Sequence, residues 1–335
     1  MTSADASSAA GGKFADVLIV GAGMAGLTAA VDLQRRGHRV LVVDKGRGPG
    51  GRLATRRYGE ATFDHGAQFV TAKDPRFAGA MAEWATSGVI AEWYRGADGR
   101  TGGHPRYRGR PTMNAVAKHL ARDVEVLLSR RVVTLRQDAD GWLAELEDGP
   151  SLRAGVVLLT APVPQALALL ESGAVAIAAE SRTSLESITY ERCLAVMAVL
   201  DGPSGIPAPG FVAPDAGPIA WLADNQAKGV STVPAITIHA SADYSLEHWD
   251  RDRQTSGQEL LAAAGRWLAA AAVDFQVHGW RYSKPVAVEK NACLILSRSP
   301  GLVIAGDAFA GPRVEGAALS GWAAAAALDE LVRQR

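Results

Sequence analysis

The N-terminal hydrophobic pattern predicts a strand, a helix and a second strand. Four consecutive apolar residues, 17–20, predict a buried strand, and a glycine-rich turn over 21–26 follows directly. Apolar residues then recur with the helical period until Gly37 ends the predicted helix. Residues 38–43 predict the second strand, which ends on Asp44. This succession is typical of the βαβ unit that opens a parallel sheet.

The pattern further along the chain mixes both periodicities. Helices are predicted over 75–93, 114–120, 254–272 and 316–333, and a polar loop over 96–110. Alternating segments at 124–128, 131–137 and 142–147 suggest a hairpin, and 156–159 and 302–305 are predicted as buried strands. Strong alternation within 186–250, followed by a strand over 277–282, predicts an antiparallel sheet.

The order of these elements predicts an α/β fold with two domains, which suits a chain of 335 residues. Residues 14–72, 112–165 and 295–335 are predicted to form a discontinuous dinucleotide-binding domain. Residues 73–111 and 166–294 are predicted to form a substrate domain around the antiparallel sheet. The small polar residues 1–13 are predicted to be a disordered leader.

Charge and composition exclude several classes of partner. Lys and Arg together number 35, as do Asp and Glu, so no net field favours nucleic acid or an anionic membrane. No segment approaches the run of about 18 apolar residues that a membrane-spanning helix needs, and no secretory signal is visible. We therefore expect a cytoplasmic protein. The two cysteines and the histidines share no ligand spacing, so we predict no metal site.

The glycine-rich turn matches the dinucleotide fingerprint GxGxxG at Gly21, Gly23 and Gly26. The first glycine permits the tight turn, the second lets the backbone approach a pyrophosphate, and the third lets helix and strand pack closely. The helix N-terminus, at Met24 and Ala25, offers free N–H groups to the phosphates. Asp44, at the end of the next strand, is placed to accept hydrogen bonds from a ribose.

Two further motifs favour FAD over NAD. After Asp44 comes a basic glycine-rich loop that includes Lys45, Gly51 and Arg52, and arginines there can pair bidentately with phosphate oxygens. Near the C-terminus, Gly306 and Asp307 follow a predicted strand, and the last helix begins shortly afterwards. An Asp in this place can bond a ribitol hydroxyl, and the positive end of the helix dipole can stabilise charge at the flavin pyrimidine edge. No cysteine lies in a motif that attaches a flavin, so we expect noncovalent FAD. The predicted cofactor-binding residues are Gly21, Gly23, Met24, Ala25, Gly26, Asp44, Lys45, Gly51, Arg52, Gly66, Ala67, Gln68, Val133, Gly306, Asp307, Glu315, Gly316 and Ala317.

These motifs together resemble the glutathione-reductase-like flavoproteins of the amine oxidase class. Within that class the chain resembles the bacterial branch of the renalase family, on the segments 63–72, 221–225, 238–240 and 280–282. The resemblance covers the chain from residue 14 onward. It implies an FAD-binding Rossmann domain of the glutathione reductase type and a substrate domain similar to that of p-hydroxybenzoate hydroxylase.

The resemblance also implies an activity. Members of the family take hydride from the 2- and 6-dihydro isomers of NAD(P), return NAD(P)+, and pass the electrons to O2, which yields hydrogen peroxide. It places Asn225, His239 and Trp280 on the substrate side of the flavin, with Gln68 and Arg281 nearby. The chain departs from the family pattern at Asp224, where relatives often carry a basic residue.

The residue types are compatible with that chemistry. Hydride loss from a dihydropyridine leaves an aromatic cation and needs no general base, so the site has only to position the donor carbon. The predicted wall, Gln68, Asn225, His239 and Trp280, contains no lysine or carboxylate. A flavin amine oxidase acting on a small amine is a second hypothesis, with Lys284 as a water-holding lysine. A non-catalytic flavin-binding sensor is a third.

Overall fold

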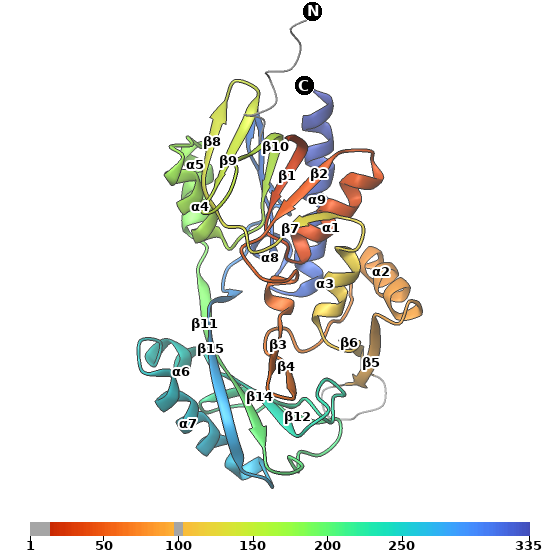
Figure 1. The fold of residues 1–335 in the computed structure, drawn as a ribbon, viewed down its shortest axis with the longest axis vertical. Helices are drawn as coiled ribbons and strands as arrows, with labels where there is room; N and C mark the ends of the chain where they lie inside the picture. Colours follow the sequence, from red (N-terminus) through yellow and green to blue (C-terminus); the bar gives the residue numbers. More distant parts are fainter. Residues whose placement is uncertain (1–13, 97–102) are drawn as a thin grey trace, which may run out of the picture.

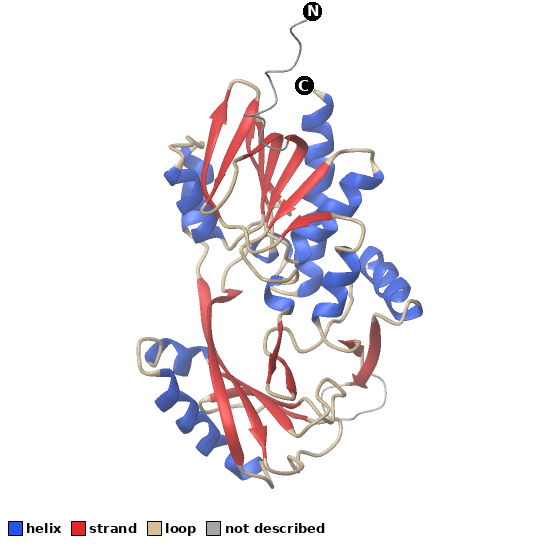
Figure 2. Ribbon diagram, in the orientation of Figure 1, coloured by secondary structure: helices blue, strands red, loops and turns tan. Residues whose placement is uncertain are grey.

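Two sheets organise the computed structural model, which describes residues 14–96 and 103–335 (Figures 1 and 2). The predicted leader lies outside the described residues. The larger sheet has eight strands and the smaller five. The long strands β11 (Tyr190–Leu200) and β15 (Ala272–Pro285) run from the smaller sheet toward the larger one (Figure 1).

The larger sheet is mainly parallel and has an antiparallel edge. Its parallel strands, in spatial order, are β17 (Gly301–Ile304), β10 (Leu152–Leu159), β1 (Phe14–Val20), β2 (Val40–Val43) and β7 (Glu125–Leu127). The strand β16 (Leu294–Arg298) pairs antiparallel with β17, and the hairpin β8 (Val132–Asp138) and β9 (Gly141–Leu146) continues from β10. The carboxyl ends of β1, β10 and β17 therefore meet at one edge, where ligands bind in such sheets.

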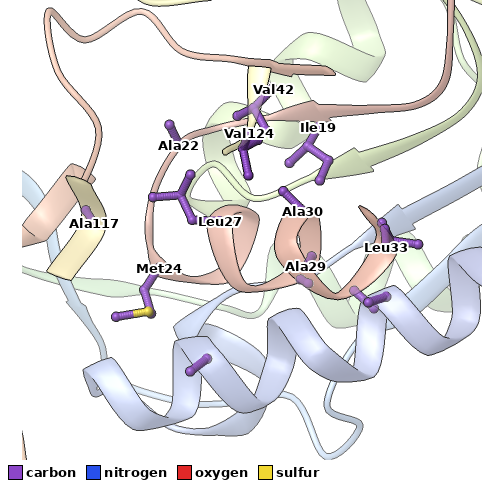
Figure 3. Packing of buried hydrophobic residues seen from close by; sticks show 14 of the residues in the cluster. Ile19, Ala22, Met24, Leu27, Ala29, Ala30, Leu33, Val42, Ala117 and Val124 are labelled. Atoms are coloured by element: carbon purple, nitrogen blue, oxygen red, sulfur yellow. The ribbon is translucent and has the colours of Figure 1, made fainter. Parts of the chain in front are cut away.

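Helices cover one face of this sheet. A hairpin and two further helices cover the other face. On the first face, α1 (Met24–Arg35) packs on β1 and β2, and α9 (Val314–Arg333) lies beside it on β10 and β17. The helix α3 (Asn114–Leu120) packs against α1. Figure 3 shows the core there, where Ile19, Leu27 and Val42 interdigitate with no exposed surface. On the second face lie the β8–β9 hairpin, α4 (Val163–Ser172) and α5 (Ala179–Glu186).

The smaller sheet is antiparallel throughout, in the order β12 (Phe211–Val212), β13 (Ile219–Asp224), β14 (Ala235–Ala240), β11 and β15. The antiparallel sheet predicted from the alternation is thus confirmed. Its outer face buries apolar side chains under α6 (Ala242–Glu247) and α7 (Arg253–Ala264). Its inner face packs Met197 against Phe63 of the hairpin β3 (Thr55–Tyr58) and β4 (Ala61–Asp64).

A third pairing lies between the two sheets. The strands β5 (Ile90–Arg95) and β6 (Pro105–Gly109) pair with each other, and β6 also bridges to Val70 through Tyr107. Short helical turns complete the chain: η1 (Gly51–Leu53), η2 (Gly265–Trp267) and α8 (Asp307–Ala310). None of the described helices is long and apolar enough to cross a membrane.

Four predicted elements differ from the structure. The helix predicted over 75–93 is α2 (Pro75–Thr86), and β5 then begins at Ile90, because Gly88 turns the chain with a φ of 70°. The loop predicted over 96–110 contains β6. The helix predicted over 254–272 ends at Ala264, since the chain must turn to pair β15 with β11. The segment 124–128 forms no hairpin, because β7 pairs in parallel with β2.

Candidate active site

The three fingerprint glycines serve different purposes in the turn between β1 and α1. Gly21 has a φ of 117°, and a Cβ there would collide with the side chain of Thr160. A Cβ on Gly26 would collide with the carbonyl of Gly21. Gly23 differs, because a Cβ there meets no protein atom within 4 Å. The first and third glycines are thus needed by the fold, while the second leaves open space before the helix N-terminus.

Asp44 fixes the turn that follows β2. Its carboxylate accepts the N–H of Ala22 at 2.6 Å and the N–H of Gly46 at 2.6 Å. The glycine-rich loop returns to the fingerprint turn, since Gly50 N–H donates to the Ala22 carbonyl at 2.8 Å. Both predicted nucleotide motifs are therefore held together by hydrogen bonds at one edge of the sheet.

Some predicted cofactor residues have other surroundings. Val133 lies on β8 with its side chain 36% exposed, and its carbonyl accepts a hydrogen bond from Ser172. The residues that bond to the Asp44 loop are instead Ser129 and Arg130, whose N–H groups reach the carbonyls of Gly46 and Asp44. Lys45 extends toward Gln165, with 3.2 Å between its Nζ and the amide oxygen.

The second and third motifs meet through an ion pair. The guanidinium of Arg52 donates two hydrogen bonds to the carboxylate of Asp307, at 2.7 and 2.6 Å. The carbonyl of Arg52 accepts the N–H of Ala67 at 2.8 Å. This pair joins the basic loop, the C-terminal motif and the segment before Gln68, although the prediction paired Arg52 with phosphate.

Glu315 holds the entrance of α2 at the N-terminus of α9. Its carboxylate accepts the N–H groups of Lys73 and Asp74 at 2.6 and 2.7 Å. A Cβ on Gly316 would collide with the carbonyl of Gly311, so the first turn of α9 admits no side chain there. Ala317 follows within the same turn. The N-terminus of α9 thus lies beside the Asp307 segment, as the C-terminal motif predicts.

The inner face of the antiparallel sheet carries a row of aromatic and polar side chains. Trp221, His239, Ala195 and His278 are direct partners across the four strands β13, β14, β11 and β15. Trp280 lies on the same face of β15, two residues beyond His278. The sheet therefore presents several predicted site residues side by side.

His65 contacts this row from the side of β4. The ring nitrogen Nε2 of His239 and the indole N–H of Trp280 both donate to the His65 carbonyl, at 3.0 and 2.9 Å. The imidazole of His65 stacks on Trp280 with 5.2 Å between ring centroids, and its edge meets His278 at 5.0 Å. The Nδ1 atom of His65 is buried without a hydrogen-bond partner among the described residues. A buried nitrogen of this kind is available to bond a ligand.

The three histidines of this cluster are neutral at physiological pH. Burial, together with His278, Arg56 and His239, lowers the pKa of His65 to about 3. Burial also lowers the pKa of His239 and of His278 to about 4 each, and Arg56 adds to the effect on His278. Desolvation disfavours the charged imidazolium, so the wall that these rings form carries no positive charge of its own.

Gln68 and Asn225 contact the protein itself. The Gln68 amide donates to the carbonyls of Asp64 and Gly66, at 2.6 and 3.1 Å. Asn225 is fully buried; its amide oxygen accepts the Asp64 N–H at 3.2 Å, and its nitrogen donates to Thr237 at 2.9 Å. Both side chains therefore hold the backbone of the segment 64–68 in place through hydrogen bonds.

A buried lysine absent from the predicted wall accompanies these amides. Lys228, with no exposed side-chain surface, donates to Asp64 at 3.0 Å and to the Gln68 oxygen at 3.3 Å. Asp224 caps the turn that carries it by accepting the N–H groups of Gln226 and Ala227. The predicted wall, which contains no lysine or carboxylate, is thus incomplete. The charges of Lys228 and Asp64 neutralise each other.

The remaining predicted residues lie elsewhere. Arg281 alternates with Trp280 along β15 and is exposed on the opposite face, where its guanidinium lies 5.9 Å from the ring centroid of Trp249. Lys284 is half exposed and pairs with Glu191 at 3.3 Å. The structure brings neither to the cluster around His65. His65 and His278 were missed, although the alternation with Trp280 could have indicated His278.

Replacing Lys228 by Met is expected to destabilise the protein strongly. The substitution leaves the Asp64 carboxylate buried without its cation, which costs about 3–5 kcal/mol of unfolding free energy. Urea unfolding of the holoenzyme measures this loss. Lys284→Met, on an exposed pair, is the control and should change stability by less than about 1 kcal/mol. Equal effects of the two substitutions would contradict the buried ion pair.

Comparisons with known proteins define the class. A model described as an NAD(P)-binding Rossmann-like domain matches residues 19–84, and the flavin-containing amine oxidoreductase model matches residues 85–329. The chain therefore belongs to the flavin-containing amine oxidoreductase family, and it is an FAD-dependent oxidoreductase.

Within this family the chain is renalase-like. Mouse renalase is 23% identical over 317 residues, which cover 88% of this chain and 92% of renalase. A putative flavin-containing monoamine oxidase of Mycobacterium tuberculosis is 47% identical over 55 residues, only 16% of this chain and 12% of that protein.

Solved structures of low identity share the fold. Putrescine oxidase superposes with a TM-score of 0.72 at 15% identity, over 96% of this chain and all of that one. A putative protoporphyrinogen oxidase from Exiguobacterium gives 0.69 at 13% identity, over 98% of this chain and all of that one.

The residues present fit FAD. The open space before Gly23 faces the N-terminus of α1, where a pyrophosphate finds N–H groups and no side chain. Asp44 and the pair of Arg52 and Asp307 lie along the same edge of the sheet. The Nδ1 of His65, in the cluster with Trp280 and His278, is a further polar atom that can bond a ligand.

Proposed function

We propose that this protein oxidises isomeric dihydronicotinamide dinucleotides, the 2- and 6-dihydro forms of NAD(P), to NAD(P)+. Bound noncovalently, FAD supplies the two-electron acceptor, and O2 regenerates it with release of hydrogen peroxide. The single observation that carries the proposal is the uncharged wall of His65, His239, His278 and Trp280.

That wall suits a hydride donor that needs no base. Three imidazoles with pKa values near 3 to 4 are uncharged at neutral pH, so they neither repel the cationic nicotinamide ring that forms nor act as general acids. The nearby carboxylate of Asp64 is tied to Lys228, so it does not serve as a base. Positioning is then the main task of the residues, as for any reaction without proton transfer.

We assign the following roles. Trp280 and His239 hold the His65 carbonyl, and this fixes the His65 ring beside the substrate space. The Nδ1 of His65 is the group left to bond a ligand, and the flat rings of His65 and Trp280 offer stacking surface. Gln68 holds the carbonyl of Gly66, and Lys228 in turn holds the amide oxygen of Gln68.

We also propose the division into a glutathione-reductase-like FAD domain and a p-hydroxybenzoate-hydroxylase-like substrate domain. The eight-stranded and five-stranded sheets support it. The helix α2, within the predicted substrate segment 73–111, packs Phe77 and Met81 into the core of the larger sheet. The helices α4 and α5 likewise pack on the larger sheet. We therefore propose that these three helices belong with the FAD domain.

An amine is the second candidate substrate. Phe69, Trp93, Tyr94, Phe211 and Trp221 form an aromatic cluster beside Gln68, with Phe211 and Trp221 stacked at 4.4 Å. Aromatic faces of this kind attract cations, which favours a protonated amine. The family match favours both enzymatic candidates over the flavin-binding sensor.

Anaerobic titration of the purified holoenzyme tests the proposal. The flavin absorbance should bleach with the 2- and 6-dihydro isomers of NAD(P) within the mixing time of a manual experiment. Ordinary NADH and NADPH, putrescine and benzylamine, at equal concentrations, should bleach it far more slowly. Bleaching by an amine, with no response to either isomer, would replace the proposal by the amine oxidase.

A further inference from the structure

Two arginines of β6 lie on the face of that strand that is turned toward the candidate site. Side chains alternate along a strand, and Tyr107 is partly buried against the core of the larger sheet. Arg106 and Arg108 therefore lie on the opposite face. The Arg106 guanidinium carbon is 5.4 Å from the ring centroid of Phe69 and 5.2 Å from that of Tyr94. Phe69 follows Gln68 directly, so Arg106 borders the candidate site.

Arg108 reaches the turn that carries Lys228. A Cβ placed on Gly229 would lie 3.2 Å from the Arg108 guanidinium nitrogen, so the two segments are in contact. Arg108 is partly buried, and burial lowers its pKa, an effect to which the neighbouring Arg110 adds. Desolvating a guanidinium is unfavourable unless an anion compensates it.

Neither arginine has a carboxylate partner among the residues that the structure describes. Within the described ranges, Arg106 donates to the carbonyl of His104 at 3.4 Å and Arg108 to that of Gly109 at 3.5 Å. Asp64 is the acidic group that acts on Arg108, and its carboxylate is already bound by Lys228. Among the described residues, the cluster of Asp64, Lys228, Arg106 and Arg108 thus carries a net charge of +2. Arg95 on the paired strand β5 differs, since Glu92 holds it bidentately at 2.7 Å.

We infer that Arg106 and Arg108 form an anion subsite that binds the phosphate groups of a dinucleotide substrate at the substrate side of the site. This inference rests on the proposed function and names the part of the donor that the protein recognises. Guanidinium groups bind phosphate oxygens bidentately, and arginine is the residue that favours planar recognition of this kind. A cationic amine would meet two like charges in the same place, which disfavours the second candidate.

Binding of ADP-ribose to the oxidised, FAD-loaded protein tests the subsite without turnover. ADP-ribose carries the diphosphate without a nicotinamide, and adenosine is the probe without phosphate. Calorimetry should show ADP-ribose binding that Arg106→Gln and Arg108→Gln each weaken at least about tenfold, the loss expected for one charge-assisted hydrogen bond. Arg95→Gln, the matched control on the same hairpin, should leave the affinity unchanged. Arg106→Lys should recover part of it.

Reduction kinetics separate the subsite from the proposed function. With a dihydro-NAD isomer, the two Gln variants should show a raised apparent dissociation constant and an unchanged limiting rate of reduction. With the matching isomer of a phosphate-free N-alkyl dihydronicotinamide, both constants should be unchanged. An equal loss with both donors, or unaltered ADP-ribose binding in the variants, would overturn the subsite. If no dihydronicotinamide reduces the flavin but the variants still lose ADP-ribose, the proposed function fails and the subsite stands.

Discussion

A Gly23→Val variant is expected to fold and to purify without FAD. The valine side chain would occupy the space before the N-terminus of α1, where no protein atom lies within 4 Å of the Cβ position. The fold therefore tolerates the side chain, but a pyrophosphate at that helix end does not. We expect a colourless protein with FAD affinity reduced at least about a hundredfold, since several charge-assisted hydrogen bonds are lost together. Absorbance of the purified protein and fluorescence titration with FAD measure both.

Two other glycines make this result specific. Gly26→Val should fail to fold, because its Cβ collides with the backbone of Gly21. Gly79→Ala, on the exposed face of α2 with no atom near its Cβ, should keep full FAD and gain up to about 1 kcal/mol of stability. A yellow Gly23→Val protein with unchanged affinity would mean that the pyrophosphate lies elsewhere.

The sequence predicts the nucleotide edge of the fold well because its signals are local. Gly21, Gly23 and Gly26 follow the four consecutive apolar residues that end β1, and the conformations that they need depend on immediate neighbours. Asp44 ends the next strand, so its place at the edge follows from the parallel pairing of β1 and β2. The same reasoning located Asp307 after β17, although not its pairing with Arg52, which is 255 residues away.

The substrate side is less predictable because its contacts are made between distant strands. Lys228 sits in a turn with Gly229, a context typical of an exposed lysine, yet it is fully buried against Asp64 from β4. His65 gains its role from His239 and Trp280, which approach from two other strands. The Ala-rich segment before β15 favours a helix by propensity, but pairing of Ala272 with Leu200 overrides it. No local sequence pattern predicts these contacts.

The pH dependence of flavin reduction is expected to distinguish the two candidate substrates. With a dihydronicotinamide donor, the limiting rate should vary less than about twofold between pH 6 and 9, because hydride leaves without a base. His65, His239 and His278 do not titrate in this range, since their pKa values lie near 3 to 4. Burial also raises the pKa of Tyr94, the tyrosine of β5 at the site, to about 12.

The other charged groups that face the cluster do not alter this expectation. Guanidinium groups are always protonated in proteins, so arginine side chains around the cluster add no titration between pH 6 and 9. Lys228 is the group to control, because burial lowers its pKa while the ion pair with Asp64 opposes the shift. Lys228 also contacts Gln68 and acts electrostatically on His239, so loss of its charge would break the buried ion pair and change stability and FAD content. FAD content and thermal stability are therefore measured at each pH.

An amine substrate would give the opposite result at the same site. Only the neutral amine donates hydride, so below the amine pKa the rate should rise up to about tenfold for each pH unit. The His239→Asn variant distinguishes titration of the substrate from titration of the protein. His239, with a pKa near 4, is neutral between pH 6 and 9, so the wild type and the variant should give the same pH profile. Stopped-flow reduction at saturating donor, in the wild type and in this variant, provides the measurement. The contrary outcome, with the dihydronicotinamide isomer, is a limiting rate that climbs steeply with pH in both proteins. That result would show that a proton leaves in the transition state, and the neutral rings around His65 could then not account for the reaction.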